Sequence, residues 1–296
     1  MLYKVGGRWG EDMPNEHAST LRAQWLGQQL REMREKSRLT LRDVGECLNR
    51  NASTVSRIES GMLPARVPEV LTYLDVCGID DPKRRDDLKT MAQDVWQKGW
   101  WDGLAANVAA SLIDWIWLES RATAIDSFQD SVIPGLLQTR TYAETVIRAA
   151  DEDLADDQLH RFVDLRMTRQ QRLSQPDPIR LSVIIDEGAL RRMVGGPETM
   201  RPQLAHLREM AGWPNVEIMI LPLTAGAHAS PNGAFDVFRM RRPYPPAGCI
   251  STVVGTVVVE GEKADSLHQR YDRLRRTALR NGAVQRVLFD LEARLE

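Results

Sequence analysis

The chain has 296 residues, of which 43% are hydrophobic and 27% are charged, and its formal net charge at pH 7 is -2. This composition is typical of a folded globular protein and excludes extensive disorder, and the length favours two domains. The slight acidity excludes a protein that coats nucleic acid over its whole surface, so any positive charge that contacts DNA must be local.

The sequence contains neither a membrane helix nor a signal peptide. No run approaches the roughly 18 apolar residues that cross a bilayer, and residues 1–20, which include Met13 as an alternative start, lack an apolar stretch. The three cysteines, Cys47, Cys77 and Cys249, and the five histidines are scattered without metal-ligand spacing. We therefore expect a cytoplasmic protein with reduced thiols, no metal site and no cofactor.

The first ordered segment is predicted to be a run of short helices. Apolar residues recur at helical spacing over Leu21–Lys36, and a further buried helix is expected over Val70–Cys77. Asp81–Pro82 begins a new segment, in which a helix is predicted through Met91 and Trp96. The predicted unit is therefore an all-α domain of four to five helices that ends near residue 80.

Residues 39–61 of this domain read LTLRDVGECLNRNASTVSRIESG and predict two short helices joined by a tight turn. Thr40 is the expected N-cap of the first helix, and Asn49 is a residue that accepts the left-handed conformation of the turn. Asn51 is the expected N-cap of the second helix, Ala52–Ser60, which Gly61 ends. This arrangement is a helix-turn-helix, whose second helix can enter a DNA major groove.

The polar positions of this motif divide into two predicted roles. Exposed positions on the second helix can reach base edges, and Arg57 is the best candidate for a bidentate contact with guanine. Residues at the helix starts suit phosphate contacts, which position a domain without reading sequence. The residues expected to contact DNA are Thr40, Arg42, Asn51, Ala52, Ser53, Thr54, Ser56 and Arg57.

The local charge agrees with DNA binding. Between Lys36 and Arg66 there are six basic residues and three acidic ones, a local excess of three in an acidic chain. Such an excess is enough to orient the domain on DNA but too small for tight nonspecific binding at physiological salt.

These residues resemble the phage-repressor-like (Xre/Cro-type) helix-turn-helix domains. The resemblance covers about residues 22–80 and depends on Leu39–Thr40 and on the run from Ser53 to Gly61. It implies that Arg34 of the first helix pairs with Glu59 to hold the fold rather than to contact DNA. The chain departs from the family at 50–52, where Arg-Asn-Ala replaces an apolar residue, serine and proline, so the bases that it reads are expected to differ.

Beyond Leu118 the predicted elements alternate between helices and strands without a regular βαβ rhythm. This favours an α+β domain with a small, mainly antiparallel sheet. Helices are expected over Tyr142–Ala150, Asp157–Ser174, Glu187–Met193, Glu198–Ala211, Ala264–Arg280 and a last segment reaching Leu295, and strands over Ile179–Asp186, Val216–Leu221, Phe235–Met240 and Val253–Glu260.

Three features of the chain beyond residue 95 admit two interpretations each. Five tryptophans between Trp96 and Trp117 could form a ligand box, but a hydrophobic hinge that packs onto the larger domain is favoured. Asp186–Glu187 could be a catalytic carboxylate pair with Glu119, but acidic residues also favour a helix N-terminus. A row of arginines could bind an acidic partner or an anion, but a solvated face with ion pairs is favoured. These arginines are Arg161, Arg166, Arg169 and Arg172.

The same half resembles the C-terminal domain of actinobacterial antitoxin-like regulators of toxin–antitoxin systems. The resemblance is carried, in order, by Gly99–Trp101, Leu118–Ile125, Val132–Glu144, Arg166–Leu173, Asp186–Gly196, Gln203–Leu207, Ile220–His228 and Gly233–Phe235. It implies a DNA-binding regulator, often encoded beside a small acidic protein that binds it. The chain departs from many relatives at 250–252, where Ile-Ser-Thr replaces an acidic and an aromatic residue.

The sequence therefore predicts a homodimeric DNA-binding transcriptional regulator, a repressor or an activator, and not an enzyme. The alternative is an antitoxin-like protein whose main role is to bind a small acidic partner, and a third hypothesis is an enzyme or a small-molecule sensor. The expected organisation is a flexible leader over 1–20, the helix-turn-helix domain over 21–80, a helical linker over 81–105, and a regulatory and dimerisation domain over 106–296.

Overall fold

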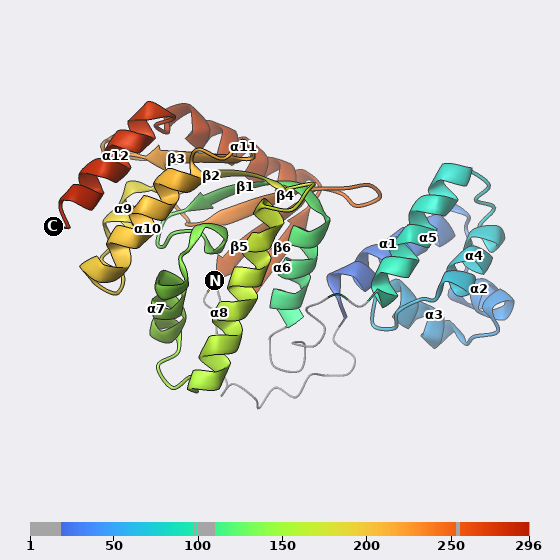
Figure 1. Ribbon diagram of the computed structural model, residues 1–296. Helices are drawn as coiled ribbons and strands as arrows, with labels where there is room; N and C mark the ends of the chain where they lie inside the picture. Colours follow the sequence, from blue (N-terminus) through green and yellow to red (C-terminus); the bar gives the residue numbers. More distant parts are fainter. Residues whose placement is uncertain (1–18, 98, 100–109, 253–254, 296) are drawn as a thin grey trace. The chain divides into compact units, whose positions relative to one another are not determined.

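The computed structural model describes residues 19–97, 99, 110–252 and 255–295 (Figure 1). Two predicted segments lie partly outside the described residues. They are the leader, up to residue 18, and the linker, at residues 98 and 100–105, which include Trp100 and Trp101. The described chain divides between Trp117 and Leu118 into two compact units. We refer to them as the helical unit, residues 19–117, and the sheet unit, residues 118–295.

The helical unit confirms the predicted run of short helices. Its helices are α1 (Leu21–Lys36), α2 (Leu41–Leu48), α3 (Ala52–Glu59), α4 (Val67–Val76) and α5 (Pro82–Trp96), and it also holds most of α6 (Ala110–Arg121). The helix predicted from Val70 begins three residues earlier, because Pro68 lies in its first turn, where a missing N–H costs nothing. Its core is formed by residues from each of the first five helices, among them Leu26, Leu30, Val44, Val55, Ile58, Val70, Tyr73, Leu74 and Leu88.

The sheet unit contains one six-stranded mixed sheet. Its strands are β1 (Ala122–Gln129), β2 (Arg180–Asp186), β3 (Val216–Leu221), β4 (Phe235–Met240), β5 (Ala247–Thr252) and β6 (Gly255–Glu260), in the order β3-β2-β1-β4-β5-β6. The pairs β3-β2 and β2-β1 are parallel and the other three pairs are antiparallel, so the predicted mainly antiparallel α+β fold is confirmed. The predicted strand over Val253–Glu260 is described from Gly255 onward.

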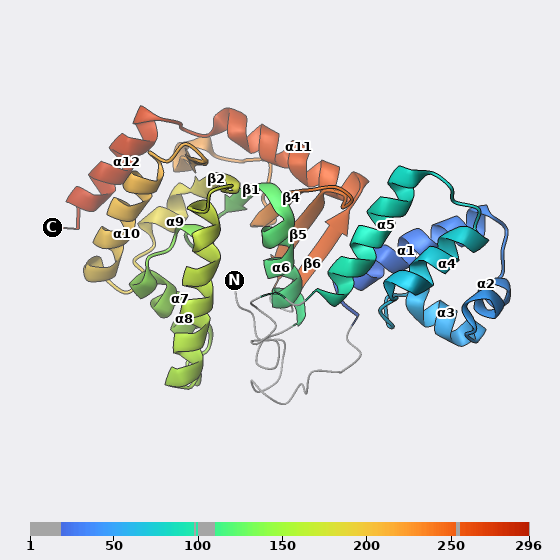
Figure 2. The ribbon, with the colours of Figure 1, turned by 45° about the vertical axis from the view of Figure 1, so that its right-hand side comes forward.

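Helices connect the parallel strands and cover the sheet. Two crossovers, one through α7 (Arg140–Ala150) and α8 (Asp156–Gln170) and one through α9 (Glu187–Arg191) and α10 (Pro197–Met210), produce the parallel pairs. Helix α11 (Glu262–Thr277) runs across one face of the sheet (Figure 2), and α12 (Gly282–Ala293) packs on α10. The core beneath α11 is formed by Phe128, Ile184, Met219, Leu221, Phe235, Val237, Leu267, Tyr271 and Leu274.

The prediction that the arginines of α8 form a surface row is wrong. Arg166 is 4% exposed and donates to the Oε1 atom of Gln138, while Arg169 makes a bidentate pair with Glu119, at 2.5 and 2.8 Å. Only Arg161 and Arg172 lie near solvent, and each contacts a neighbouring residue of its own segment. The row is therefore divided, with Arg166 and Arg169 turned towards the interior and Arg161 and Arg172 near solvent.

Two described tryptophans of the cluster, Trp96 and Trp117, contact different parts of the helical unit. The Trp117 ring packs edge-on against Trp25 of α1, with centroids 5.5 Å apart, and the Nε1 atom of Trp96 donates to the Ala65 carbonyl at 2.8 Å. Each of these two side chains packs on or bonds to another part of its own unit. Asp186 is the N-cap of α9 and accepts a hydrogen bond from the Gly188 amide at 2.8 Å, as predicted for a helix N-terminus.

Candidate nucleic-acid interface

The turn between α2 and α3 forms as its capping residues predict. The Thr40 hydroxyl accepts from the Asp43 amide while the Asp43 carboxylate accepts from the Thr40 amide, which closes a capping box at the start of α2. Asn49 has φ of 53° and ψ of 44°, the left-handed conformation expected of it. The Oδ1 atom of Asn51 then accepts from the Thr54 amide at 2.7 Å and starts α3. These local bonds determine where α3 begins.

Glycines allow α3 to approach the neighbouring helices closely. A Cβ atom on Gly27 of α1 would lie 2.5 Å from the carbonyl oxygens of Ile58 and Glu59, and one on Gly45 would lie 2.6 Å from the Arg50 carbonyl. Gly61 has φ of 73°, so α3 ends at the left-handed residue that the sequence predicted. Larger side chains at Gly27 or Gly45 would push α3 away from α1 or α2.

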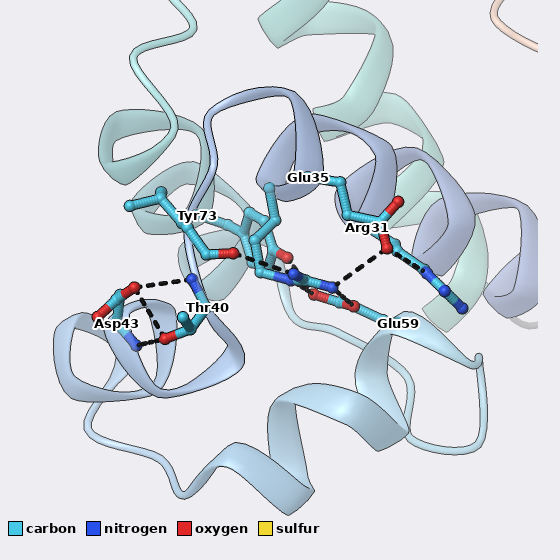
Figure 3. A network of polar contacts seen from close by, with 8 residues as sticks. Arg31, Glu35, Thr40, Asp43, Glu59 and Tyr73 are labelled. Atoms are coloured by element: carbon cyan, nitrogen blue, oxygen red, sulfur yellow. Dashed lines mark hydrogen bonds and ion pairs between the residues drawn. The ribbon is translucent and has the colours of Figure 1, made fainter.

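A buried ion pair fixes the far end of α3 (Figure 3). The Arg34 guanidinium binds both carboxylate oxygens of Glu59, at 2.6 and 2.8 Å, and also donates to the Leu39 carbonyl at 3.0 Å. The Tyr73 hydroxyl of α4 donates to the same carboxylate at 2.5 Å. The side chains of Arg34 and Glu59 are 11% and 5% exposed, so this pair is shielded from water and salt.

Hydrogen bonding and burial shift the pKa values of Arg34 and Tyr73 in this network. The hydrogen bonds that Arg34 donates to Glu59 raise the pKa of Arg34 above its ordinary range. Burial, and then the hydrogen bond to Glu59, raise the pKa of Tyr73, so that its hydroxyl stays a donor. The structural pairing of Arg34 with Glu59 that the resemblance implied is confirmed. Tyr73 was missed, because nothing in a buried helix sequence distinguishes a tyrosine that donates to a carboxylate from one that only packs.

The eight predicted DNA-contacting residues lie on α2, on α3 and at their caps. On α3 the buried residues are Val55, Ile58 and Glu59, whereas the outer face is exposed. All eight predicted residues except Thr54, which is half-buried, have exposed side chains. Thr40 and Arg42 contact residues of their own helix, Asp43 and Glu46, and the other six surround the first turns of α3.

The polar groups of this face differ in how far they are already occupied. Arg57 makes no side-chain hydrogen bond or ion pair with any residue that the structure describes, so its five N–H donors are available. Arg42 shares an exposed ion pair with Glu46 at 3.0 Å, which costs little to exchange for another partner. Asn51 uses its oxygen for capping, and its amide N–H₂ group has no partner within the described chain.

Arg50 is a cation that the prediction of site residues did not include. It lies directly before the N-cap of α3 and is 51% exposed, and its Nη2 atom is 2.9 Å from the Glu69 carboxylate of α4. Glu69 also accepts from the Arg66 amide at 2.9 Å and thereby begins α4. Arg50 was recognised in the sequence only as part of the local charge, because its proximity to Glu69 depends on how α4 folds back on α2.

Two further features, membrane-spanning helices and clusters of metal-ligating side chains, are absent from the described residues. No described helix is both long and apolar enough to pass through a bilayer. Among residues 19–97, 99, 110–252 and 255–295, histidine, cysteine and acidic side chains do not gather in any group of three that could hold a metal ion.

Comparison with known proteins agrees with the division into two units. Residues 25–88 match the model of a helix-turn-helix domain, and residues 112–288, more than half of the chain, match the model described as Domain of unknown function (DUF5753). Neither the curated proteins nor the solved structures include a match to the chain. The chain therefore belongs to the DUF5753 family and carries a helix-turn-helix domain at its N-terminal side.

Proposed function

We propose that the protein is a sequence-specific DNA-binding transcriptional regulator of the Xre/Cro type, which inserts α3 into the major groove. The observation that carries this proposal is the contrast between the two faces of α3. One face is held by Gly27 and by the buried Arg34–Glu59 pair, while the other exposes an unpaired arginine, Arg57. A rigid helix with free donors on its outer face is what reading base edges requires.

The exposed groups support a division of labour along the motif. Arg57 has the donor geometry for the O6 and N7 atoms of guanine, and Ser53 and Ser56 can donate to or accept from other bases. Ala52 offers a methyl group that can contact thymine. Asn51, the exposed residues Thr40 and Arg42, and the half-buried Thr54 are proposed to hold phosphates.

We propose that the protein works as a homodimer in the cytoplasm. The exposed face of a single eight-residue helix reaches only a few base pairs. Regulators of this kind reach useful specificity by placing two recognition helices in successive major grooves, about 34 Å apart. The sheet unit is the proposed dimerisation and regulatory part. The antitoxin-like alternative keeps the family resemblance but loses the support of the arginine row, because Arg166 is buried and Arg169 is engaged by Glu119.

The experiment that tests this function selects binding sites from random DNA. The purified full-length protein is incubated with a library of random duplexes, and the bound fraction is amplified and sequenced over several rounds. The proposal predicts an enriched motif with two related half-sites separated by about one helical turn. A library that remains random after selection, or that enriches only by overall composition, would contradict sequence-specific binding.

A further inference from the structure

The two edges of the sheet are protected differently. At one edge, β3 is joined to the segment after α11, where Ile220 and Leu279 exchange backbone hydrogen bonds of 3.2 and 2.8 Å. At the other edge, β6 pairs with β5, and no other strand of the described residues lies beside it (Figure 2). In the described chain no backbone group bonds to the outer side of β6. Half of its backbone N–H and C=O groups therefore face away from the sheet.

The sequence of this open edge lacks the usual features that prevent pairing with another strand. Strand β6 reads GTVVVE, with neither lysine nor proline, and its register with β5 runs without a bulge. Val257, an apolar residue of a type that is common within sheets, is 48% exposed on this edge strand. Natural edge strands normally carry charges, prolines or bulges where pairing must be avoided.

We propose that β6 is the dimer interface, at which its outer edge pairs in antiparallel fashion with β6 of a second copy of this chain. The proposal rests on the proposed function, which requires two recognition helices on one DNA site. A twofold axis perpendicular to the sheet, passing through either Val257 or Val258, makes the two strands equivalent and keeps each face of the sheet continuous. The two sheets then form a single one of twelve strands.

The distribution of charge on β6 favours a second copy as the occupant. Glu260 is the one ionisable side chain of the strand, and it lies at the end. In either register the two Glu260 carboxyls are about 14–20 Å apart, at a rise of about 3.4 Å per residue, while the neutral valines meet at the centre. Burial also raises the pKa of Glu260 to about 7, so its carboxyl carries only part of its charge at neutral pH. Like charges therefore do not oppose self-pairing.

A cysteine cross-linking experiment tests this interface. On a Cys47→Ser background, which removes the exposed native thiol, Val257→Cys and Val258→Cys are introduced separately into the full chain. Directly opposite residues of antiparallel strands have Cα atoms about 4.5–5.5 Å apart, within the range of a disulfide. Under mild oxidation one of the two variants is expected to form a disulfide-linked dimer in high yield. Arg161→Cys, on the exposed face of α8, is the control for random collision.

A pair of charge variants tests the interface without covalent chemistry. Val257→Lys and Val257→Glu are each expected to weaken dimerisation at least tenfold, measured by light scattering. An equal mixture of the two should form dimers again. The neutral control Val257→Thr should dimerise as the wild type does. A monomeric wild type at tens of micromolar would overturn the proposal. So would a dimeric wild type in which neither cysteine cross-links above the control.

The outcome for DNA is measured separately. If β6 cross-links but the protein selects no DNA motif, the proposed function fails and the interface stands. If the protein selects a motif while dimerising elsewhere, the interface fails and the function stands.

Discussion

Replacing Glu59 by glutamine tests whether the buried network holds α3 in place. The Glu59 carboxylate accepts two hydrogen bonds from Arg34 and one from Tyr73, and its side chain is only 5% exposed. Glutamine keeps the shape but leaves the Arg34 cation without its buried counter-charge. Breaking one side of a buried ion pair costs about 3–5 kcal/mol. Arg34 would keep its hydrogen bond to the Leu39 carbonyl and a second carboxylate, that of Glu35, at 3.7 Å. We therefore expect a loss at the lower end of this range, about 3 kcal/mol of unfolding free energy.

Hydrogen exchange measured by mass spectrometry reads this loss in α3 itself. A loss of about 3 kcal/mol should accelerate exchange of the α3 amides roughly a hundredfold, if they exchange through opening of the helical unit. The matched control is Glu46→Gln, which makes the same chemical change in an exposed pair with Arg42, where side chains are 84% and 67% exposed. The control should change exchange by less than about threefold. Equal effects of the two substitutions would refute the reasoning.

Three further predictions concern packing, pH and charge. Gly27→Ala should destabilise the helical unit by about 1–3 kcal/mol in thermal unfolding, since its Cβ atom would lie 2.5 Å from two carbonyl oxygens. The control Gly282→Ala, whose Cβ atom would meet nothing within 4 Å, should not destabilise the protein. Burial raises the pKa of Asp236 to about 6 from an ordinary 3.8, so the folded state keeps a proton longer and stability falls as pH rises from about 4 to 6. Asp236→Asn should therefore raise the melting temperature clearly at pH 7.5 but little at pH 4, and an equal shift at both would contradict this. Glu69→Gln should free Arg50 and tighten binding to nonspecific duplex roughly two- to fivefold with a steeper salt dependence in fluorescence anisotropy, and an unchanged slope would count against it.

The helix-turn-helix could be predicted almost residue by residue because its signals are local. Thr40, Asn49, Asn51 and Gly61 act on neighbouring backbone groups, so their effect does not depend on the rest of the fold. The outward direction of Arg57 follows from the helical period once Val55 and Ile58 are placed inside. The candidate site was therefore predictable to the extent that short-range capping and periodicity determine it.

The central strand of the sheet was not predicted, because its signals are long-range. Helix α6 passes directly into β1 at Arg121–Ala122 without a glycine or proline between them. Strand β1 also carries Asp126, a buried carboxylate whose partner Arg239 is 113 residues away. A polar residue of this kind suggests a loop until the partner strand is known.

Strand β5 was missed for a reason of packing. Its residues 247–252 include two small residues, Ala247 and Gly248, which do not favour a strand by propensity. A Cβ atom at Gly248 would lie 2.5 Å from the Cδ1 atom of Leu267 of α11, so the glycine makes room for a side chain that is distant in sequence. The arginines of α8 were misassigned in the same way, since Glu119 and Gln138 are distant in sequence.

The central claim, that α3 reads DNA bases, is tested most directly by Arg57→Ala on the selected binding site. Binding of wild type, Arg57→Ala and Arg161→Ala, a control in the sheet unit, is measured across a salt series, on the selected site and on a scrambled duplex. We predict that Arg57→Ala loses about 1–3 kcal/mol on the selected site, with a much smaller loss on scrambled DNA, while Arg161→Ala binds both as the wild type does. Equal binding of wild type and Arg57→Ala to the selected site would contradict base reading by this helix.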